Sequence, residues 1–108
     1  MQGGEKMKIV GITACTAGIA HTYIAKEKIL IAAKELGHTA KIETQGSIGV
    51  EDKLTEEDIK SADVVLLATD INVDKSRFTG KPVVDVPISM IMKSPKSVIM
   101  SIAKKLGY

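Results

Sequence analysis

The amino-acid sequence predicts an α/β protein, a three-layer open sheet of four mainly parallel strands in the order 2-1-3-4 with helices on both faces. Two observations support this fold class. Short runs rich in valine and isoleucine are bounded by turn residues, as strands are. Patterns of helical periodicity lie between these runs, and such alternation is typical of parallel strands joined by right-handed crossovers. The four runs are MKIVGIT (7–13), TAKIETQ (39–45), DVVLLAT (63–69) and PVVDV (82–86).

The longest helical pattern follows the first strand and reads GIAHTYIAKEKILIAAKELG, with Gly37 as its C-cap. One of its faces is apolar and is expected to pack on the sheet. This face consists of Ala25, Ile29, Ala32, Ala33 and Leu36. A second apolar group lies away from it and consists of Ile19, Tyr23 and Leu30. Either a neighbouring helix covers this second group, or it forms a docking surface beside the loop that precedes the helix.

Shorter helical patterns follow the second, third and fourth predicted strands. LTEEDIKSA is predicted to be a helix with Thr55 as N-cap and Asp58 in the position of a capping-box acid. The segment VDKSRF is expected to form a single helical turn. SPKSVIMSIAKKLGY is predicted to be the last helix, with Ser94 as N-cap and Pro95 at the first helical position. The acidic run VEDKLTEED is expected to be a solvated loop and helix start.

Length and composition indicate one compact domain. The chain has 108 residues, of which 44% are hydrophobic, and its formal net charge is +2. We expect a flexible tail over residues 1–6 and a single domain over residues 7–108. With three aromatic residues and no basic block, the sequence is not that of a nucleic-acid-binding protein. No apolar run approaches the roughly 20 residues that span a bilayer, so direct membrane insertion is not expected.

The single cysteine, Cys15, lies in the stretch ACTAGIAHT between the first strand and the first helix. One cysteine cannot form an internal disulfide, which favours a reducing, cytoplasmic location. Open parallel sheets bind ligands at the carboxyl ends of their strands, and Cys15 is predicted to lie at that edge. The amides from about Thr16 to Thr22 include several that the helix leaves unpaired, and these can point toward one anion. The loop therefore suits either a thiolate or a phosphoryl group bound to its sulfur.

Several interpretations of Cys15 remain open on this basis. A lone cysteine is often an inert, buried small hydrophobe. A thioredoxin-like redox site needs a second cysteine, and the chain has none. A cysteine phosphatase loop needs an arginine at C-x5-R to clamp the phosphoryl oxygens, but His21 stands there and the chain's one arginine is Arg77. A loop that holds a phosphoryl group without the means to hydrolyse it suits a phosphoryl carrier.

CTAGIAHT resembles the CPTGIAHT loop of the fructose-type enzyme IIB domains of the bacterial phosphoenolpyruvate-dependent sugar phosphotransferase system. The resemblance continues through KIETQGSIGVEDKLTEEDIKSADVVLLATD to VDKSRFTGKPV and thus covers nearly the whole chain after Met7. Its specific motifs are GIAHT, ETQGS and RF-x-GK. One departure lies in the loop, where Thr16 replaces the usual proline and Ala17 follows where threonine is common. This change restores a backbone N–H at position 16 and relaxes a fixed φ.

The resemblance implies roles for individual residues. Cys15 would be the phosphocysteine, and the phosphoryl-binding loop would consist of Thr16, Ala17, Gly18, Ile19, Ala20, His21 and Thr22. His21 either stabilises the phosphoryl group or lines the helix start, and Thr22 either donates to a phosphoryl oxygen or bonds the helix backbone. A second turn, which consists of Gln45, Gly46 and Ser47, is expected to lie beside Cys15. It is expected either to contact a partner or to brace the loop.

Other polar residues near these motifs are expected to have structural roles. Asp70 is interpreted as a turn or cap residue, Arg77 and Lys81 as local structural residues, and His38 as a solvated residue at the opposite end.

The resemblance also implies an activity and its partners. In that family, a phosphohistidine on enzyme IIA passes its phosphoryl group to the IIB cysteine, which phosphorylates a sugar bound to the membrane channel, enzyme IIC. The chain would then be a protein-phosphohistidine–sugar phosphotransferase for fructose or a related sugar, cytoplasmic and held at the inner face of the membrane through enzyme IIC. No metal or organic cofactor is expected. The alternatives are a phospho-dependent module that binds a transcription regulator and a stand-alone phosphatase.

Overall fold

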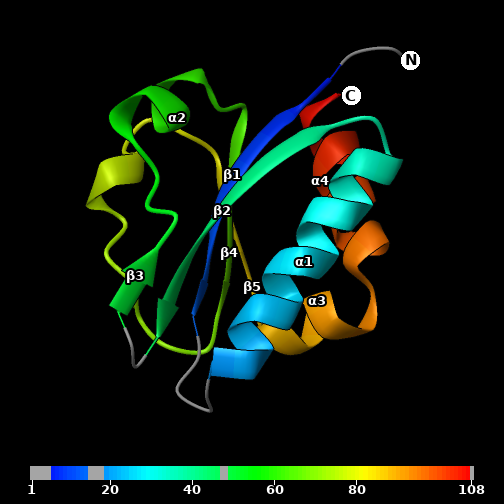
Figure 1. Ribbon diagram of the computed structural model, residues 1–108. Helices are drawn as coiled ribbons and strands as arrows, with labels where there is room; N and C mark the ends of the chain where they lie inside the picture. The colour runs from blue at the N-terminus through cyan, green and yellow to red at the C-terminus, as the bar shows by residue number, and fades with distance from the viewer. Residues whose placement is uncertain (1–5, 15–18, 47–48, 108) are drawn as a thin grey trace.

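The computed structural model describes residues 6–14, 19–46 and 49–107, which form a five-stranded sheet with helices on both faces (Figure 1). The strands lie in the order β3-β2-β1-β4-β5. Their bounds are β1 Lys8–Ala14, β2 Thr39–Gly46, β3 Gly49–Glu51, β4 Val64–Thr69 and β5 Val83–Val86. The helices are α1 Ile19–Glu35, α2 Glu56–Ser61, the short 3₁₀ helix η1 Ser76–Phe78, α3 Ile88–Lys93 and α4 Pro95–Leu106.

The α/β class is confirmed, but the predicted count of four strands and the order 2-1-3-4 are wrong for the whole sheet. The four expected strands are parallel neighbours, β2-β1-β4-β5, and the additional strand β3 pairs antiparallel with β2 at the sheet edge. The three residues of β3 are all exposed. They therefore show no inside-outside alternation, and the first two residues of the predicted solvated loop, Val50 and Glu51, belong to a strand that pairs with Thr44–Gly46.

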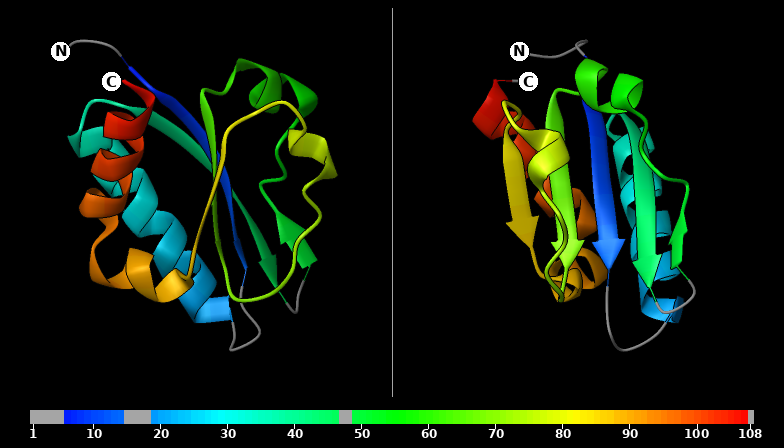
Figure 2. Two further views of the ribbon diagram at one scale, coloured as in Figure 1. Left: turned by 180° about the vertical axis from the view of Figure 1, so that it is seen from behind. Right: turned by 90° about the vertical axis from the view of Figure 1, so that its left-hand side faces the viewer.

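Two helical layers cover the sheet (Figure 2). Helices α1, α3 and α4 pack on one face around a core that includes Ile29, Leu66 and Ile99, whereas α2 and η1 cover the other face around Leu67 and Phe78. Strand β1 is buried between these layers, which explains its nearly continuous apolar sequence. Helix α3 was not predicted, because its six residues show no cap signal, but Ile88 and Ile91 are buried.

The predicted helix ends mostly agree with the structure. Gly37 follows α1 with φ of 83°, a left-handed conformation that glycine adopts without steric cost. The capping box of Thr55 and Asp58 is confirmed, with both hydrogen bonds present. Pro95 is the first residue of α4 and Ser94 its N-cap, although the Ser94 side chain makes no capping hydrogen bond. The predicted turn in VDKSRF is η1.

The predicted sheet-facing side of α1 is confirmed, since four of its residues are buried and Leu36 packs against the same core. The residues of the second apolar group have different surroundings. Leu30 packs partly buried against the core, while the Tyr23 hydroxyl donates to Glu51 of β3. The side chain of Ile19 lies outside the described residues.

Candidate functional site

The carboxyl ends of β2, β1 and β4 lie together at one edge of the sheet. Ala14, the last residue of β1, is opposite Gln45 of β2 and Thr69 of β4. Helix α1 begins at Ile19 and carries the chain back over the sheet (Figure 1). Cys15 is the next residue after Ala14, so this sheet edge is the place where the sequence predicts the reactive loop.

Much of the predicted loop lies outside the described residues. This applies to Cys15, Thr16, Ala17 and Gly18, to the side chains of Ile19, Ala20 and His21, and to Ser47 in the second turn. The described part of the candidate site is its frame: the strand ends, the first turns of α1, Thr22, Gln45 and the backbone of Gly46.

Thr22 is the one predicted loop residue whose side chain is described, and it lies inside the protein. It is 3% exposed, and its Oγ1 has no hydrogen-bond partner among the described residues. The Thr13 hydroxyl on β1 donates to the Thr22 carbonyl oxygen at 3.2 Å, which joins β1 to the first turns of α1. A buried hydroxyl without a partner is unfavourable, and Thr22 Oγ1 has no partner among the described residues.

Glu43 of β2 is a buried carboxylate that the sequence interpretation missed. Its side chain is 1% exposed and forms a two-pronged ion pair with Arg77, Nη1 to Oε1 and Nη2 to Oε2, each at 3.0 Å. Gln45 Nε2 donates to Oε2 at 2.7 Å, and the Leu54 backbone N–H donates to Oε1 at 2.9 Å. The sequence contains one indication of this site: an acidic residue lies inside a predicted strand and points to the opposite face of the sheet from Ile42.

The surroundings of Glu43 keep it ionised. Burial of the carboxyl acts to raise its pKa, but the hydrogen bonds from Arg77, Gln45 and Leu54 outweigh burial and hold the pKa below its ordinary value of 4.5. The expected structural role of Arg77 is confirmed by this pair. Lys81 is likewise structural, since its Nζ donates to the carbonyl oxygens of Lys60 and Ala62.

Two polar contacts join α1 to the β3 segment. The Tyr23 hydroxyl donates to Glu51 Oε1 at 2.5 Å, and Lys26 forms an ion pair with Asp52. The hydrogen bond to Glu51 raises the pKa of Tyr23, and the Lys26 ammonium lowers the pKa of Asp52. Asp52 has φ of 52°, a left-handed conformation that aspartate tolerates better than most residues. These contacts hold the start of α1 beside the end of the β2–β3 hairpin.

Asp70, which the sequence predicts to be a turn or cap residue, follows β4 at the same sheet edge. Its Oδ1 accepts a hydrogen bond from the backbone N–H of Ile88, the first residue of α3, at 3.4 Å.

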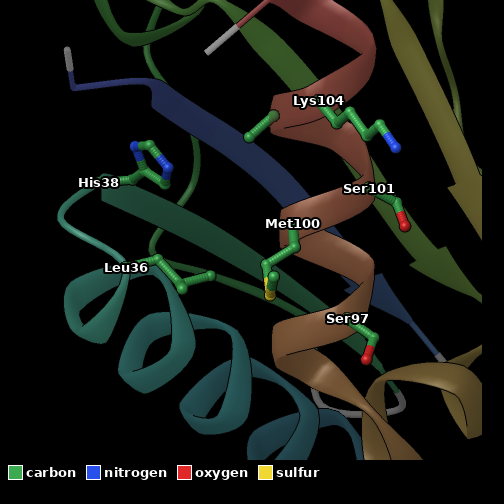
Figure 3. Close-up of a pocket in the computed structure, with 7 residues that line it drawn as sticks. Leu36, His38, Ser97, Met100, Ser101 and Lys104 are labelled. Atoms are coloured by element: carbon green, nitrogen blue, oxygen red, sulfur yellow. The ribbon is translucent and has the colours of Figure 1, made fainter. Parts of the chain in front are cut away.

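A surface pocket is found at the other end of the sheet. It lies between α1 and α4, has a volume of about 600 Å³, and is lined in part by Leu36, His38 and Met100. His38 is half-buried rather than solvated as expected, and its Nδ1 accepts a hydrogen bond from the Met7 backbone N–H at 3.0 Å. Figure 3 shows the serine and lysine side chains of α4 pointing away from His38, so the polar groups of this pocket do not converge. We therefore place the candidate site at the edge with Ala14.

Neither a metal site nor a membrane span is found in the described part of the chain. Its histidine, aspartate and glutamate side chains form no group of three that could hold a metal ion. None of its helices is both long enough and apolar enough to cross a bilayer.

Comparisons with known proteins give concordant results. The family described as "PTS system, Lactose/Cellobiose specific IIB subunit" matches residues 10–101. The chain is 47% identical over 101 residues to the PTS system fructose-like EIIB component 2 of Escherichia coli (strain K12), with 93% of this chain and 95% of that protein covered. It is 43% identical over 94 residues to the PTS system fructose-specific EIIABC component of Bacillus subtilis (strain 168), with 87% of this chain and 15% of that protein covered.

Solved structures agree with these relatives. A crystal structure of a domain from the fructose-specific IIABC component of Borrelia burgdorferi superimposes with a TM-score of 0.86 at 47% identity. The match covers 90% of this chain and 93% of that domain.

Proposed function

The chain belongs to the family of PTS system IIB subunits, and from this premise we propose that it carries a phosphoryl group on Cys15 between a phosphohistidine and a sugar. The Cys15 thiolate attacks the phosphorus of the phosphohistidine in line. The S–P bond forms as the N–P bond breaks, and the imidazole leaves. In the second step a sugar hydroxyl attacks the same phosphorus, the S–P bond breaks to regenerate the thiolate, and the hydroxyl proton passes to solvent. Such transfers depend on positioning and on stabilisation of the transferring charge.

The observation that best supports this proposal is the buried hydroxyl of Thr22 in the first turn of α1, which has no hydrogen-bond partner among the described residues. Strand β1 ends at Ala14 on the carboxyl edge of the sheet, and α1 begins at Ile19 with the positive end of its dipole at the same edge. Thr22 Oγ1 makes no hydrogen bond to the described residues, so it has a donor to offer to a phosphoryl oxygen. In this proposal the backbone amides from Thr16 to Thr22 surround the remaining phosphoryl oxygens.

The names of the relatives support the proposed donor and acceptor. The Bacillus subtilis relative is an EIIABC component, and another relative in Escherichia coli is a fructose-like EIIBC component, 50% identical over 93 residues with 19% of its length covered. These names combine the B unit with A and C units. We therefore propose enzyme IIA as phosphohistidine donor and enzyme IIC as sugar-bearing acceptor, with this chain working at the cytoplasmic face of the membrane. The proposed sugar class is fructose or a related sugar.

Arg77 supports a carrier over a phosphatase. A cysteine phosphatase places an arginine in its loop to clamp the phosphoryl oxygens, but both terminal nitrogens of Arg77 bind Glu43. Arg77 is the one arginine of the chain. A phosphoryl group on Cys15 would thus lack the bidentate clamp that promotes hydrolysis.

The test is phosphorus NMR after incubation with phosphoenolpyruvate and the upstream phosphotransfer proteins. The wild-type protein should show a thiophosphate signal, and Cys15→Ser should not. A matched control moves the thiol to the exposed face of α4 in the double variant Cys15→Ser, Ser101→Cys, which should also remain unphosphorylated. A thiophosphate signal from the double variant, or its absence from the wild-type protein, would refute the assignment of Cys15.

A further inference from the structure

The ion pair of buried Glu43 with Arg77, whose side chain is 26% exposed, lies near the end of β2, yet the transfer mechanism above does not use it. The two residues are 34 positions apart in the sequence and meet through two parallel hydrogen bonds of 3.0 Å. Each Glu43 oxygen accepts a second hydrogen bond, from Leu54 or from Gln45. The carboxylate is thus fully satisfied, with four donors around it.

Stability alone does not account for such a cluster. A buried ion pair can often be replaced by apolar side chains without loss of stability, because removing two charges from water offsets most of their attraction. A satisfied ion pair of this kind does provide fixed geometry. The two parallel hydrogen bonds from the planar guanidinium hold the carboxylate in one orientation. The question is which part of the protein this geometry fixes.

The cluster fixes the end of β2. Gln45 lies two residues beyond Glu43 on the same side of the strand, and its amide nitrogen is held by Glu43 Oε2 at 2.7 Å. In the parallel register Gln45 is the partner of Ala14, the residue that precedes Cys15. The orientation of the Gln45 side chain, beside the strand that leads into the reactive loop, therefore depends on Glu43.

Rigid segments hold the cluster from the other side. The guanidinium carbon of Arg77 lies 5.2 Å from the centre of the Phe78 ring, and Phe78 is 1% exposed in the core beneath η1. The Leu54 backbone, which donates to Glu43, belongs to the segment that leads into α2, and the Leu54 side chain is 3% exposed. Glu43 is thus braced by two segments on the α2 side of the sheet.

We propose that Glu43 and Arg77 are positioning residues for phosphoryl transfer, which act by holding Gln45 at the end of β2 beside the β1 segment that leads into Cys15. The inference rests on the proposed role of Cys15 as phosphoryl acceptor. Its physical basis is that in-line transfer requires close alignment, so a small displacement of the supporting strand slows the reaction even when the fold is intact.

The test is single-turnover transfer from phosphorylated enzyme IIA to the full chain, with rates corrected for the folded fraction measured by circular dichroism. We expect Glu43→Gln and Arg77→Met each to lower the transfer rate at saturating donor by about tenfold or more. The half-saturating donor concentration should change less than about twofold, because in this proposal the pair acts through Gln45 and not by binding the donor. The double variant should be no slower than the slower single variant, as for residues that act as one unit.

Matched controls come from an exposed ion pair nearby. Lys75 and Asp85 are paired at 3.0 Å with side chains about half exposed, and Lys75→Met and Asp85→Asn should transfer at the wild-type rate. If Arg77→Met does not fold, Arg77→Lys keeps the charge but not the two-pronged geometry, and an intermediate rate is expected.

The outcomes separate this inference from the function on which it rests. Rates per folded molecule within about twofold of wild type in Glu43→Gln and Arg77→Lys would overturn the positioning role while Cys15 remained the acceptor. Absence of transfer to the wild-type chain would instead overturn the proposed function, and this inference with it.

Discussion

At the scale of single residues, Thr22 is the most informative side chain of the candidate site. Its hydroxyl is 3% exposed and makes no hydrogen bond within residues 6–14, 19–46 and 49–107. A buried polar group that lacks a partner lowers stability, and it persists where it has another use. Removal of the Thr22 hydroxyl is therefore expected to have opposite effects on stability and on phosphoryl transfer.

We predict that Thr22→Val leaves the folded protein as stable as wild type or more stable by about 1 kcal/mol, because it removes an unsatisfied hydroxyl. The same change should slow phosphoryl transfer by about tenfold, through the loss of one donor to the transferring group. Urea unfolding and single-turnover transfer measure the two effects. Thr13→Val is the control, since it removes the hydrogen bond to the Thr22 carbonyl and should destabilise by about 1 kcal/mol. A Thr22→Val protein that is destabilised as much as Thr13→Val would contradict this interpretation of Thr22.

Glu43 illustrates what residue patterns do not reveal. Strand periodicity correctly places Ile42 and Glu43 on opposite faces, and both are buried. An acidic residue at such a position is expected to face solvent unless it is paired. Its partner Arg77 is 34 positions away, in a segment whose local pattern indicates only a turn. The pairing depends on how η1 folds back over the sheet.

At the scale of secondary-structure elements, the close approach of β1 and β4 depends on Gly11. The two strands are parallel neighbours, with Gly11 opposite Leu66. A Cβ at Gly11 would lie 2.3 Å from the Leu66 backbone oxygen, which cannot move without disturbing β4. The absence of a side chain at this position is thus part of the central strand pairing.

We predict that Gly11→Ala destabilises the protein by about 3 kcal/mol, at the upper end of overpacking effects, because backbone atoms must separate. Gly37→Ala is the comparison. Its added Cβ meets nothing within 4 Å, so only the left-handed backbone at φ of 83° opposes it, with a cost of about 1 kcal/mol. Equal losses for the two variants in urea unfolding would argue against the close contact at Leu66.

The elements that were predicted incorrectly are short ones. Helix α1, the capping box of α2 and the proline start of α4 have local signals and were predicted correctly. Strand β3 has three exposed residues, and α3 follows directly after Pro87 without a side-chain cap. Segments of this length form because neighbouring segments supply hydrogen bonds and buried contacts.

At the scale of the whole molecule, paired carboxylates determine how stability depends on pH. The pKa of Glu43 lies below its ordinary value of 4.5, and the pKa of Asp58 lies below its ordinary value of 3.8 because Lys41 and the Thr55 backbone donate to it. A lowered pKa in the folded state means that the unfolded chain binds protons first as pH falls. The contribution of each carboxylate is therefore present above its unfolded pKa and is lost as pH falls through its folded pKa.

We predict that the free energy of unfolding changes little from pH 7 to about pH 5 and then decreases toward acid. Glu43→Gln and Asp58→Asn should each be less stable than wild type at pH 7, and the difference from wild type should shrink as pH falls below 4.5 for Glu43→Gln and below 3.8 for Asp58→Asn. Exposed Glu56 of α2 provides the control, since Glu56→Gln should run parallel to wild type. Urea unfolding at several pH values measures these curves. A Glu43→Gln curve that stays parallel to wild type down to acid pH would show that Glu43 contributes nothing to the acid sensitivity.

Local sequence patterns are sufficient to predict the α/β class, the parallel neighbours of β1, the main helix ends and the position of the cysteine between β1 and α1. These features follow from local periodicity and caps, which are properties of adjacent residues. Four features are seen only in the tertiary structure: the antiparallel strand β3, the helix α3, the buried hydroxyl of Thr22 and the ion pair of Glu43 with Arg77. Each of these depends on contacts between segments distant in the sequence, which form only when the layers of the fold pack together.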